Sequence, residues 1–274
     1  MPPPGAHVSS LFSLEGRCAA VVGASSGLGA HLASVLHEAG ADVVLCARRV
    51  GRLKDLAAEL GLQRQKAWPE ASSGGAFVVE MDVADPVAVP KGFDAVEACL
   101  NGRTCDIVLN CAGIAIPKLT VETSDEDYEA LMAVNQRGAF YVAREAARRM
   151  IRAKLPGSII NIGSILGLRQ EKAQATYGMS KAAMIQMTKI MALELASNNI
   201  RVNCIAPGYF RTEINEEFFD SEKGKAFVKR IPMRRLGQAS ELDAVTLTLA
   251  SEKAGSFITG ACIVVDGGHT LSAL

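Results

Sequence analysis

Short apolar runs rich in β-branched residues alternate along the chain with longer segments whose apolar residues recur at helical spacing. The short runs are almost continuously apolar, which is typical of strands covered on both faces. Strands are predicted at 19–22, 42–47, 77–81, 107–110, 158–162, 201–205 and 261–265, and helices at 28–39, 50–60, 86–100, 125–152, 177–197 and 240–251. Regular strand–helix alternation predicts an α/β fold with a doubly wound parallel sheet.

Two segments interrupt this alternation. Residues 62–75 (LQRQKAWPEASSGG) are polar, lack a period and end in Ser and Gly, so they are predicted to form a surface loop. Residues 211–235 contain a Phe-rich amphipathic stretch with a basic end, which is interpreted as a mobile flap. Neither segment marks a domain boundary. A single domain over 17–274 is therefore expected, preceded by a Pro-rich N-terminal arm over 1–16.

Charge and composition exclude several classes of protein. The 29 basic and 29 acidic residues give a formal net charge of zero, whereas a dedicated nucleic-acid binder carries a basic excess. No apolar run approaches the roughly 20 residues that a membrane-spanning helix needs. The first residues lack the basic and apolar regions of a signal peptide, and residues 1–16 hold too little positive charge for a transit peptide. A cytoplasmic protein is expected.

The cysteines and histidines do not form a metal-site pattern. The seven cysteines are scattered without a C-x-x-C pair, so structural roles as small buried residues are expected. They are Cys18, Cys46, Cys99, Cys105, Cys111, Cys204 and Cys262. Histidine occurs at only four positions, which disfavours a mechanism based on a His base or a His metal cluster.

A glycine-rich turn joins the first predicted strand to the first predicted helix. It contains Gly23, Ser25, Ser26, Gly27, Leu28 and Gly29. Glycines at this junction allow a pyrophosphate to approach the helix N-terminus, where free N–H groups favour anions. The same residues match G-x-S-x-G, the nucleophile elbow of α/β-hydrolases. Only one strand precedes Ser25, whereas such hydrolases have several, so the phosphate-binding interpretation is preferred.

The ends of the next two strands bear on the choice of nucleotide. An acidic residue after the second strand would bind the ribose 2′-hydroxyl of NAD, but here Ala47 is followed by Arg48 and Arg49. Arginine suits a 2′-phosphate because its planar fork donates two hydrogen bonds. A solvated basic patch is the alternative. Asp82 and Val83, after the third strand, are predicted to lie beside an adenine.

A tyrosine and a lysine occupy one face of a later helix. Tyr177 and Lys181 are four residues apart, and Ser164 ends the preceding predicted strand segment. A lysine ammonium favours the phenolate of a nearby tyrosine, which could then exchange a proton with a ketone or an alcohol. A Tyr-x-x-x-Lys pair by itself occurs on many helices by chance and is weak support.

Together these motifs resemble the short-chain dehydrogenase/reductase superfamily, in its single-domain form of about 250 residues with a Rossmann fold. The resemblance extends over nearly the whole chain, and the motifs stand in family order. They are the Gly23/Gly27/Gly29 loop, Asp82, Asn110-Cys-Ala-Gly113, Asn135, Ser164, Tyr177/Lys181, and Pro207-Gly208 through Thr212. Two positions depart from the pattern, with Val22 for the usual Thr and Cys111 for the second Asn.

The resemblance implies a role for each matching residue. Tyr177 would be the general acid or base, Lys181 would favour its ionised form and bind the nicotinamide ribose, and Ser164 would hold the substrate oxygen. Asn135 would hold a water that connects Lys181 to solvent. Further cofactor contacts are implied at Asn110, Ala112, Gly113, Pro207, Gly208, Phe210 and Thr212.

The expected activity is hydride transfer between a ketone and a secondary alcohol. NADP(H) is the expected cofactor because of Ala47 and Arg48, although Ser26 replaces the basic residue of many NADP-using relatives and NAD(H) use stays open. Ile116, Leu119, Ile165, Leu166, Leu168 and the flap would line the substrate pocket, which indicates an apolar ketone or alcohol.

Alternatives remain for the substrate and for the protein's class. The row Arg144, Arg148 and Arg152 is compatible with docking of an acyl carrier protein, which keeps a 3-oxoacyl-thioester reductase open. A catalytically silent nucleotide-binding or scaffold protein is the alternative of a different class. Relatives are commonly tetramers built from the two long helices and the last strand. A homotetramer or dimer is expected, with no nucleic-acid or membrane partner and no metal.

Overall fold

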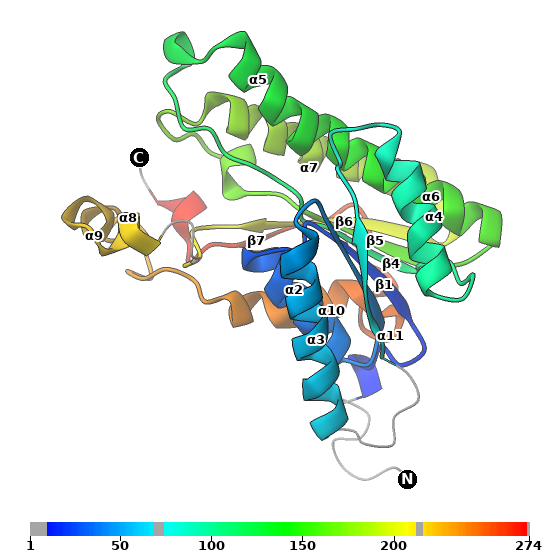
Figure 1. Cartoon of the computed structure of the whole chain (residues 1–274). Coiled ribbons are helices and arrows are strands. Elements are labelled where there is room, and N and C mark those ends of the chain that lie inside the picture. The colour runs from blue at the N-terminus through cyan, green and yellow to red at the C-terminus, as the bar shows by residue number, and fades with distance from the viewer. Residues whose placement is uncertain (1–9, 68–73, 212–215, 273–274) are drawn as a thin grey trace.

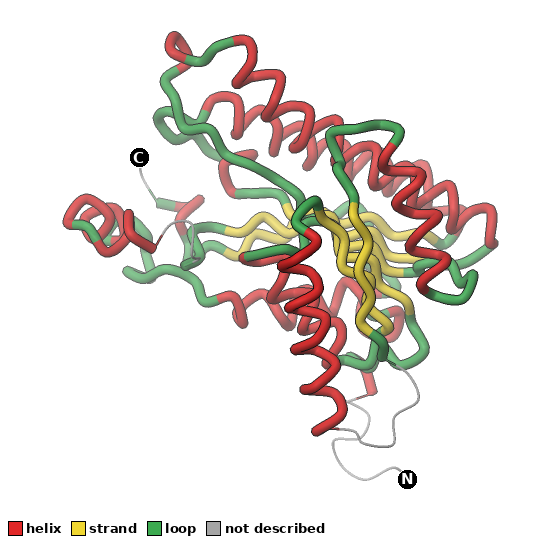
Figure 2. Tube along the Cα trace, viewed as in Figure 1, coloured by secondary structure: helices red, strands yellow, loops and turns green. Residues whose placement is uncertain are grey.

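The computed structural model describes residues 10–67, 74–211 and 216–272. Within these residues a seven-stranded sheet has the order β3-β2-β1-β4-β5-β6-β7 (Figures 1 and 2). All of its strand pairs are parallel. The strands are β1 (Cys18–Val22), β2 (Asp42–Ala47), β3 (Ala76–Glu80), β4 (Ile107–Asn110), β5 (Gly157–Ile162), β6 (Ile200–Pro207) and β7 (Cys262–Val265). The predicted doubly wound sheet is confirmed, and each strand lies within two residues of its predicted position.

Helices cover both faces of the sheet (Figure 2). One layer holds α2 (Gly27–Glu38), α3 (Val50–Ala67), α10 (Asp243–Ala250) and α11 (Glu252–Gly255), and the other holds α4 (Ala88–Cys99), α5 (Asp125–Met132), α6 (Ala139–Ala153) and α7 (Ala175–Leu195). In β1 the side chains alternate between the two resulting cores, because Ala20 and Val22 face the α4–α6–α7 layer while Ala19 and Val21 face the other. Burial on both faces explains why the strands are apolar throughout.

The predicted helix 125–152 is divided in the structure. A π-helical turn (Ala133–Gly138) separates α5 from α6. Gly138 lies so close to Val83 that an added Cβ would be 2.8 Å from the Val83 carbonyl oxygen. Turns of this kind occur often at functional sites, and this one contains Asn135.

The prediction of a surface loop over 62–75 is wrong for its first part. Residues 62–67 continue α3 to Ala67, and the Gln63 amide donates to Glu59 Oε1 at 3.0 Å, one helical turn earlier. These residue types are strong helix formers, and a helix exposed to water on most sides has no apolar period that would reveal it. Residues 68–73 lie outside the described residues, and β3 begins at Ala76.

Two short helices project beyond the carboxyl end of the sheet (Figure 1). They are α8 (Glu216–Asp220) and α9 (Glu222–Val228), within the segment predicted as a flap. Of the predicted N-terminal arm, residues 1–9 are not described, whereas Leu14 is buried and its N–H donates to the Ala39 carbonyl at 2.7 Å. Among the helices that the structure describes, none combines the length and apolarity that crossing a membrane requires.

Candidate active site

The strand order changes direction beside β1, whose neighbours are β2 and β4. In open α/β sheets a ligand crevice forms at such a point, outside the carboxyl ends of the strands. A cleft of about 680 Å³ lies there. Segments that follow six strands line it, and they supply Gly23, Ser25, Ser26, Gly27, Leu28, Gly29, Arg48, Arg49, Asp82, Val83, Ala112, Gly113, Ser164, Tyr177, Lys181, Pro207 and Gly208. Most of the site residues predicted from the sequence therefore share one cleft.

The turn after β1 fits a phosphate-bearing ligand. Gly23 adopts a φ of +93°, and a Cβ on it would lie 2.6 Å from the Ala112 backbone nitrogen. A Cβ on Gly29 would lie 2.2 Å from the Gly23 carbonyl oxygen, so both positions require glycine. Ser26 stands at the N-cap of α2 without making a side-chain capping bond. The first N–H groups of α2 are thus open to an anion.

The two arginines after β2 differ in their surroundings. The Arg49 guanidinium donates to Ser25 Oγ at 2.8 Å and to Ser26 Oγ at 2.7 Å, so it is fixed against the glycine turn. The Arg48 side chain is exposed and makes no hydrogen bond or ion pair within the described part of the chain. Arg48 therefore lies in the cleft with all of its donors available.

The asparagine of the predicted ribose-binding segment does not line the cleft. Asn110 is fully buried, and its amide nitrogen donates to the Ala139 carbonyl at 3.0 Å and to Asn161 Oδ1 at 3.1 Å. Asn161 in turn donates to Thr188 on α7. The Asn110 side chain thus connects β4 to β5 and α6, and Cys111, Ala112 and Gly113 are the residues of this segment that reach the cleft.

Three groups able to hold or move a proton meet at the cleft. Lys181 is 4% exposed, its Nζ donates to the Ile162 carbonyl at 2.9 Å, and it lies 5.6 Å from the centre of the Tyr177 ring. Ser164 follows β5 and accepts a hydrogen bond from the Leu166 N–H at 3.1 Å. The Ser164 hydroxyl proton is not used in that bond, so it can be donated to a ligand.

Asn135 lies behind these groups rather than on the surface of the cleft. Its Oδ1 accepts from the Ile114 N–H and its Nδ2 donates to the Ile114 carbonyl, both at 2.8 Å. A Cβ on Gly113 would lie 3.5 Å from both Asn135 Oδ1 and Lys181 Nζ, so the two side chains flank that glycine. The sequence did not indicate this two-point attachment of the Ile114 backbone, because backbone groups leave no residue-type signal.

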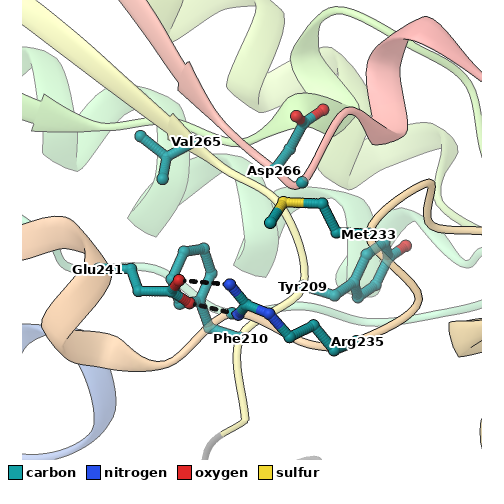
Figure 3. A pocket seen from close by; sticks show the side chains of 9 residues that line it. Tyr209, Phe210, Met233, Arg235, Glu241, Val265 and Asp266 are labelled. Carbon is teal, nitrogen blue, oxygen red and sulfur yellow. Dashed lines mark hydrogen bonds and ion pairs between the residues drawn. The ribbon is translucent and has the colours of Figure 1, made fainter.

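The segment after β6 contributes to two hollows, with Gly208 in the cleft and Tyr209 and Phe210 in a separate one. Phe210 lines a separate hollow of about 110 Å³ together with Met233, Val265 and Asp266 (Figure 3). At the edge of that hollow, Arg235 forms two hydrogen bonds with Glu241 and lowers the pKa of that carboxyl to about 2. A cofactor contact by Phe210 would therefore come from its backbone. Thr212 lies outside the described residues.

Tyr209, which the sequence analysis did not single out, is part of an aromatic cluster. Tyr209 packs edge-on against Phe227 at 4.7 Å and Phe219 at 6.0 Å, and lies 5.6 Å from the His269 ring. Burial, together with the nearby Glu171 and Tyr177, raises the pKa of Tyr209 to about 12. The cluster connects α8 and α9 to the C-terminal segment, so part of the predicted flap packs against Tyr209 and His269.

Among the described residues, no group of three or more His, Cys, Asp or Glu side chains is placed to hold a metal ion. The proton-transfer groups at the cleft are instead a serine, a tyrosine and a lysine. These side chains can exchange a proton or a hydrogen bond with a substrate oxygen in the same cleft that a dinucleotide would occupy.

Comparison with known proteins gives one consistent family. A family model described as Enoyl-(Acyl carrier protein) reductase matches residues 23–270. The D-arabinitol 2-dehydrogenase (ribulose-forming) of Scheffersomyces stipitis is 35% identical over 273 residues, covering 96% of this chain and 97% of the relative. A short-chain type dehydrogenase/reductase from Mycobacterium marinum superposes with a TM-score of 0.86 at 36% identity, covering 96% and 99% of the two chains. A gluconate 5-dehydrogenase from Burkholderia cenocepacia J2315, solved with NADP and tartrate, gives 0.88 at 35% identity, covering 97% and 100%.

Proposed function

The chain belongs to the short-chain dehydrogenase/reductase superfamily, and on that premise we propose that it is an NADP(H)-dependent oxidoreductase that interconverts a ketone and a secondary alcohol. One observation carries the proposal: Ser164, Tyr177 and Lys181 line the same cleft as the glycine turn. The cleft fits a nicotinamide dinucleotide because Gly23 and Gly29 permit close approach and the α2 N-terminus is open. When bound, the cofactor supplies or accepts the hydride.

In this proposal each residue acts on a stated atom. The Tyr177 hydroxyl donates its proton to the ketone oxygen in reduction and takes it back in oxidation. The Ser164 hydroxyl donates a hydrogen bond to the same oxygen and stabilises the charge that develops on it. The buried Lys181 ammonium, 5.6 Å from the centre of the Tyr177 ring, places positive charge beside the reacting hydroxyl. Asn135 fixes the Ile114 backbone and lies close to Lys181 across Gly113, where it can hold a water for proton exchange.

Preference for NADP(H) over NAD(H) is supported by two arginines with different tasks. Arg49 is held by Ser25 and Ser26, so it places positive charge beside the glycine turn. Arg48 has its donors free within the described residues, and Ala47 provides no carboxylate to bind a ribose 2′-hydroxyl. In this proposal, Arg48 receives the 2′-phosphate through paired hydrogen bonds.

An exchange of charge tests the cofactor preference. We expect Arg48→Asp to lower the ratio of kcat/KM for NADPH to kcat/KM for NADH by about 100-fold, because a bidentate phosphate contact is replaced by a repulsive carboxylate. Lys54→Asp makes the same change of charge on the exposed side of α3 and should leave the ratio unchanged. A wild-type preference for NADH would overturn this part of the proposal.

The names of two relatives indicate which alcohols to test as substrates. The relatives act, by their names, on D-arabinitol and on gluconate, which are secondary alcohols. A second candidate, reduction of a 3-oxoacyl thioester, is favoured by a relative from Aquifex aeolicus named 3-oxoacyl-(acyl-carrier-protein) reductase, which is 34% identical over 259 residues. Turnover should be screened with polyols, sugar acids, apolar ketones and a 3-oxoacyl thioester. Turnover of the thioester alone would select the second candidate.

The arginine row on α6 gives the thioester candidate little further support. Arg149 is buried and pairs with Asp94, Glu97 and Glu145. Arg152 also pairs with Glu97, and Arg144 lies over the rings of Phe140 and Tyr141. Arg149 and Arg152 therefore stabilise the contact between α4 and α6, whereas Arg144 contacts rings of its own helix.

Homo-oligomerisation is part of the same proposal. Exposed apolar side chains occur on α6 and α7 and near β7, which is an edge strand of the sheet. They are Phe140, Ile151, Met179, Ile190, Leu193, Phe257, Val264 and Leu271. Apolar residues gathered on two helices and a sheet edge are typical of subunit contacts. Light scattering after size-exclusion chromatography should show a tetramer or a dimer, and a monomer would contradict the proposal.

A further inference from the structure

Two cysteines face each other across the last pair of strands. Cys204 on β6 and Cys262 on β7 are direct register partners in the parallel ladder, so both side chains lie on the same side of the sheet. The Cys204 thiol donates a hydrogen bond to the Ile205 carbonyl at 3.5 Å. Neighbouring strands are about 4.8 Å apart, which lies within the range of Cα separations that a disulfide spans.

Cys262 differs from the buried cysteines in its chemistry. Burial raises the pKa of the Cys18 and Cys111 thiols to about 11 and that of Cys46 and Cys105 further, so these thiols stay protonated. The pKa of the buried Cys204 thiol is raised as well, by its neighbour Cys262 and by burial. Cys262 is half-buried, and the neighbouring Cys204 thiol and the charge of Lys189 on α7 lower its pKa below the ordinary value. Cys262 is therefore the member of the pair that forms a thiolate.

Cys204 also contacts the residue that precedes the proposed catalytic serine. An added Cβ on Gly163 would lie 2.6 Å from Cys204 Sγ, so this sulfur packs against the residue that precedes Ser164. The strands that carry the pair lead into Pro207–Gly208 at the cleft and into Asp266–Gly267 beside Tyr209. A change in the position of Cys204 Sγ therefore changes the support of Gly163.

We propose that Cys204 and Cys262 form a redox-active dithiol that hydroperoxides convert to an intramolecular disulfide, and that this disulfide slows turnover. The sulfurs must approach to about 2.05 Å, which draws Cys204 Sγ towards β7 and away from Gly163. The slowing of turnover, which is the kinetic half of the proposal, rests on the proposed oxidoreductase function. Formation of the disulfide, which is the chemical half, does not.

The chemistry balances with hydrogen peroxide as the oxidant. The Cys262 thiolate attacks one peroxide oxygen, the O–O bond breaks, and a sulfenic acid forms as hydroxide leaves and is protonated to water. The Cys204 thiol then attacks that sulfur, the S–O bond breaks, and a second water leaves with the thiol proton. Two thiols are oxidised to one disulfide while one hydrogen peroxide is reduced to two waters.

Peptide mapping of the full-length reduced protein tests the chemical half. After treatment with an equimolar amount of hydrogen peroxide, we expect a cross-linked peptide joining Cys204 to Cys262, lighter by two hydrogen atoms than its reduced components. Dithiothreitol should remove the cross-link. Cys262→Ser should abolish it, whereas Cys99→Ser, a change at another half-buried cysteine that lies on α4, should leave it intact. Oxidation of Cys262 to the sulfinic acid without any cross-link would overturn the proposal.

The same samples test the kinetic half. We expect kcat to fall by about tenfold as the cross-link forms and to recover with dithiothreitol, because small displacements of catalytic groups slow turnover strongly. Cys262→Ser should keep its activity under peroxide. Full cross-linking with unchanged kcat would overturn the proposed effect of the disulfide on turnover. If the reduced protein turns over no substrate at all, the proposed function fails. Peptide mass then still shows whether the disulfide between Cys204 and Cys262 forms.

Discussion

The two ends of strand β5 carry serines with opposite tasks. Ser158, near the amino end, is fully buried and donates its hydroxyl to the Leu249 carbonyl at 2.7 Å. Ser164, just past the carboxyl end, keeps its hydroxyl proton free for a ligand and lines the cleft. One hydroxyl is used to hold α10 on the sheet, and the other is available for chemistry.

Charged groups at the two ends of the sheet follow the same division. At the amino end Asp42 accepts from the Gly74 and Gly75 N–H groups at 2.7 Å and pairs with Arg103, while Asp106 pairs with Arg17. At the carboxyl end Arg48 has no partner among the described residues. Groups with free donors are available to bind a ligand, so Arg48 differs in this respect from the paired groups at the amino end.

The largest contrast is expected between the two serines. Ser164→Ala should lower kcat/KM by about 100- to 1000-fold, because a hydrogen bond to the developing alkoxide is lost. Its free energy of unfolding should change little, since the one bond removed is that from Leu166 N–H. Steady-state kinetics and urea denaturation measure the two effects.

Ser158→Ala is the matched control on the same strand. It should lower the free energy of unfolding by about 1 kcal/mol, because a buried hydrogen bond is removed, and should leave kcat/KM unchanged. If both serine variants lost activity to a similar degree, the division between the two ends of the sheet would be wrong.

A pH-dependent effect, on stability alone, is expected from the acidic residue at the start of β2. Burial acts to raise the pKa of Asp42, but the bonds from Arg103, Gly75 and Gly74 outweigh it and hold the pKa below its usual value. A carboxyl with a lower pKa in the folded state adds stability above its unfolded pKa of about 3.9, and loses it as the pH falls further.

Asp42→Asn should therefore lower the free energy of unfolding at neutral pH by about 1–3 kcal/mol, since the Arg103 partner is half-exposed and is screened by water. The difference from wild type should shrink below about pH 4. Thermal unfolding between neutral and acidic pH measures this. A difference that stays constant down to pH 3 would show that Asp42 acts through packing rather than charge.

The fold and most of the cleft could be predicted from the sequence because both depend on residue type. Apolar runs mark strands buried on two faces, and the glycine turn needs residues without a Cβ. Contacts that depend on backbone groups left no such signal, such as the hydrogen bonds of Asn135 to Ile114. The extension of α3 was missed because a solvated helix lacks apolar periodicity, and Tyr209 because its partners come from distant segments.

The central claim is that Tyr177 transfers the proton to or from the substrate oxygen. Binding of the dinucleotide to the same cleft does not depend on that proton. Tyr177→Phe removes the phenolic proton and keeps the ring. The account predicts that NADPH affinity, measured by calorimetry, stays within about threefold of wild type while kcat for the substrate found by screening falls by about 100- to 10,000-fold. Unchanged turnover in the variant would contradict the mechanism.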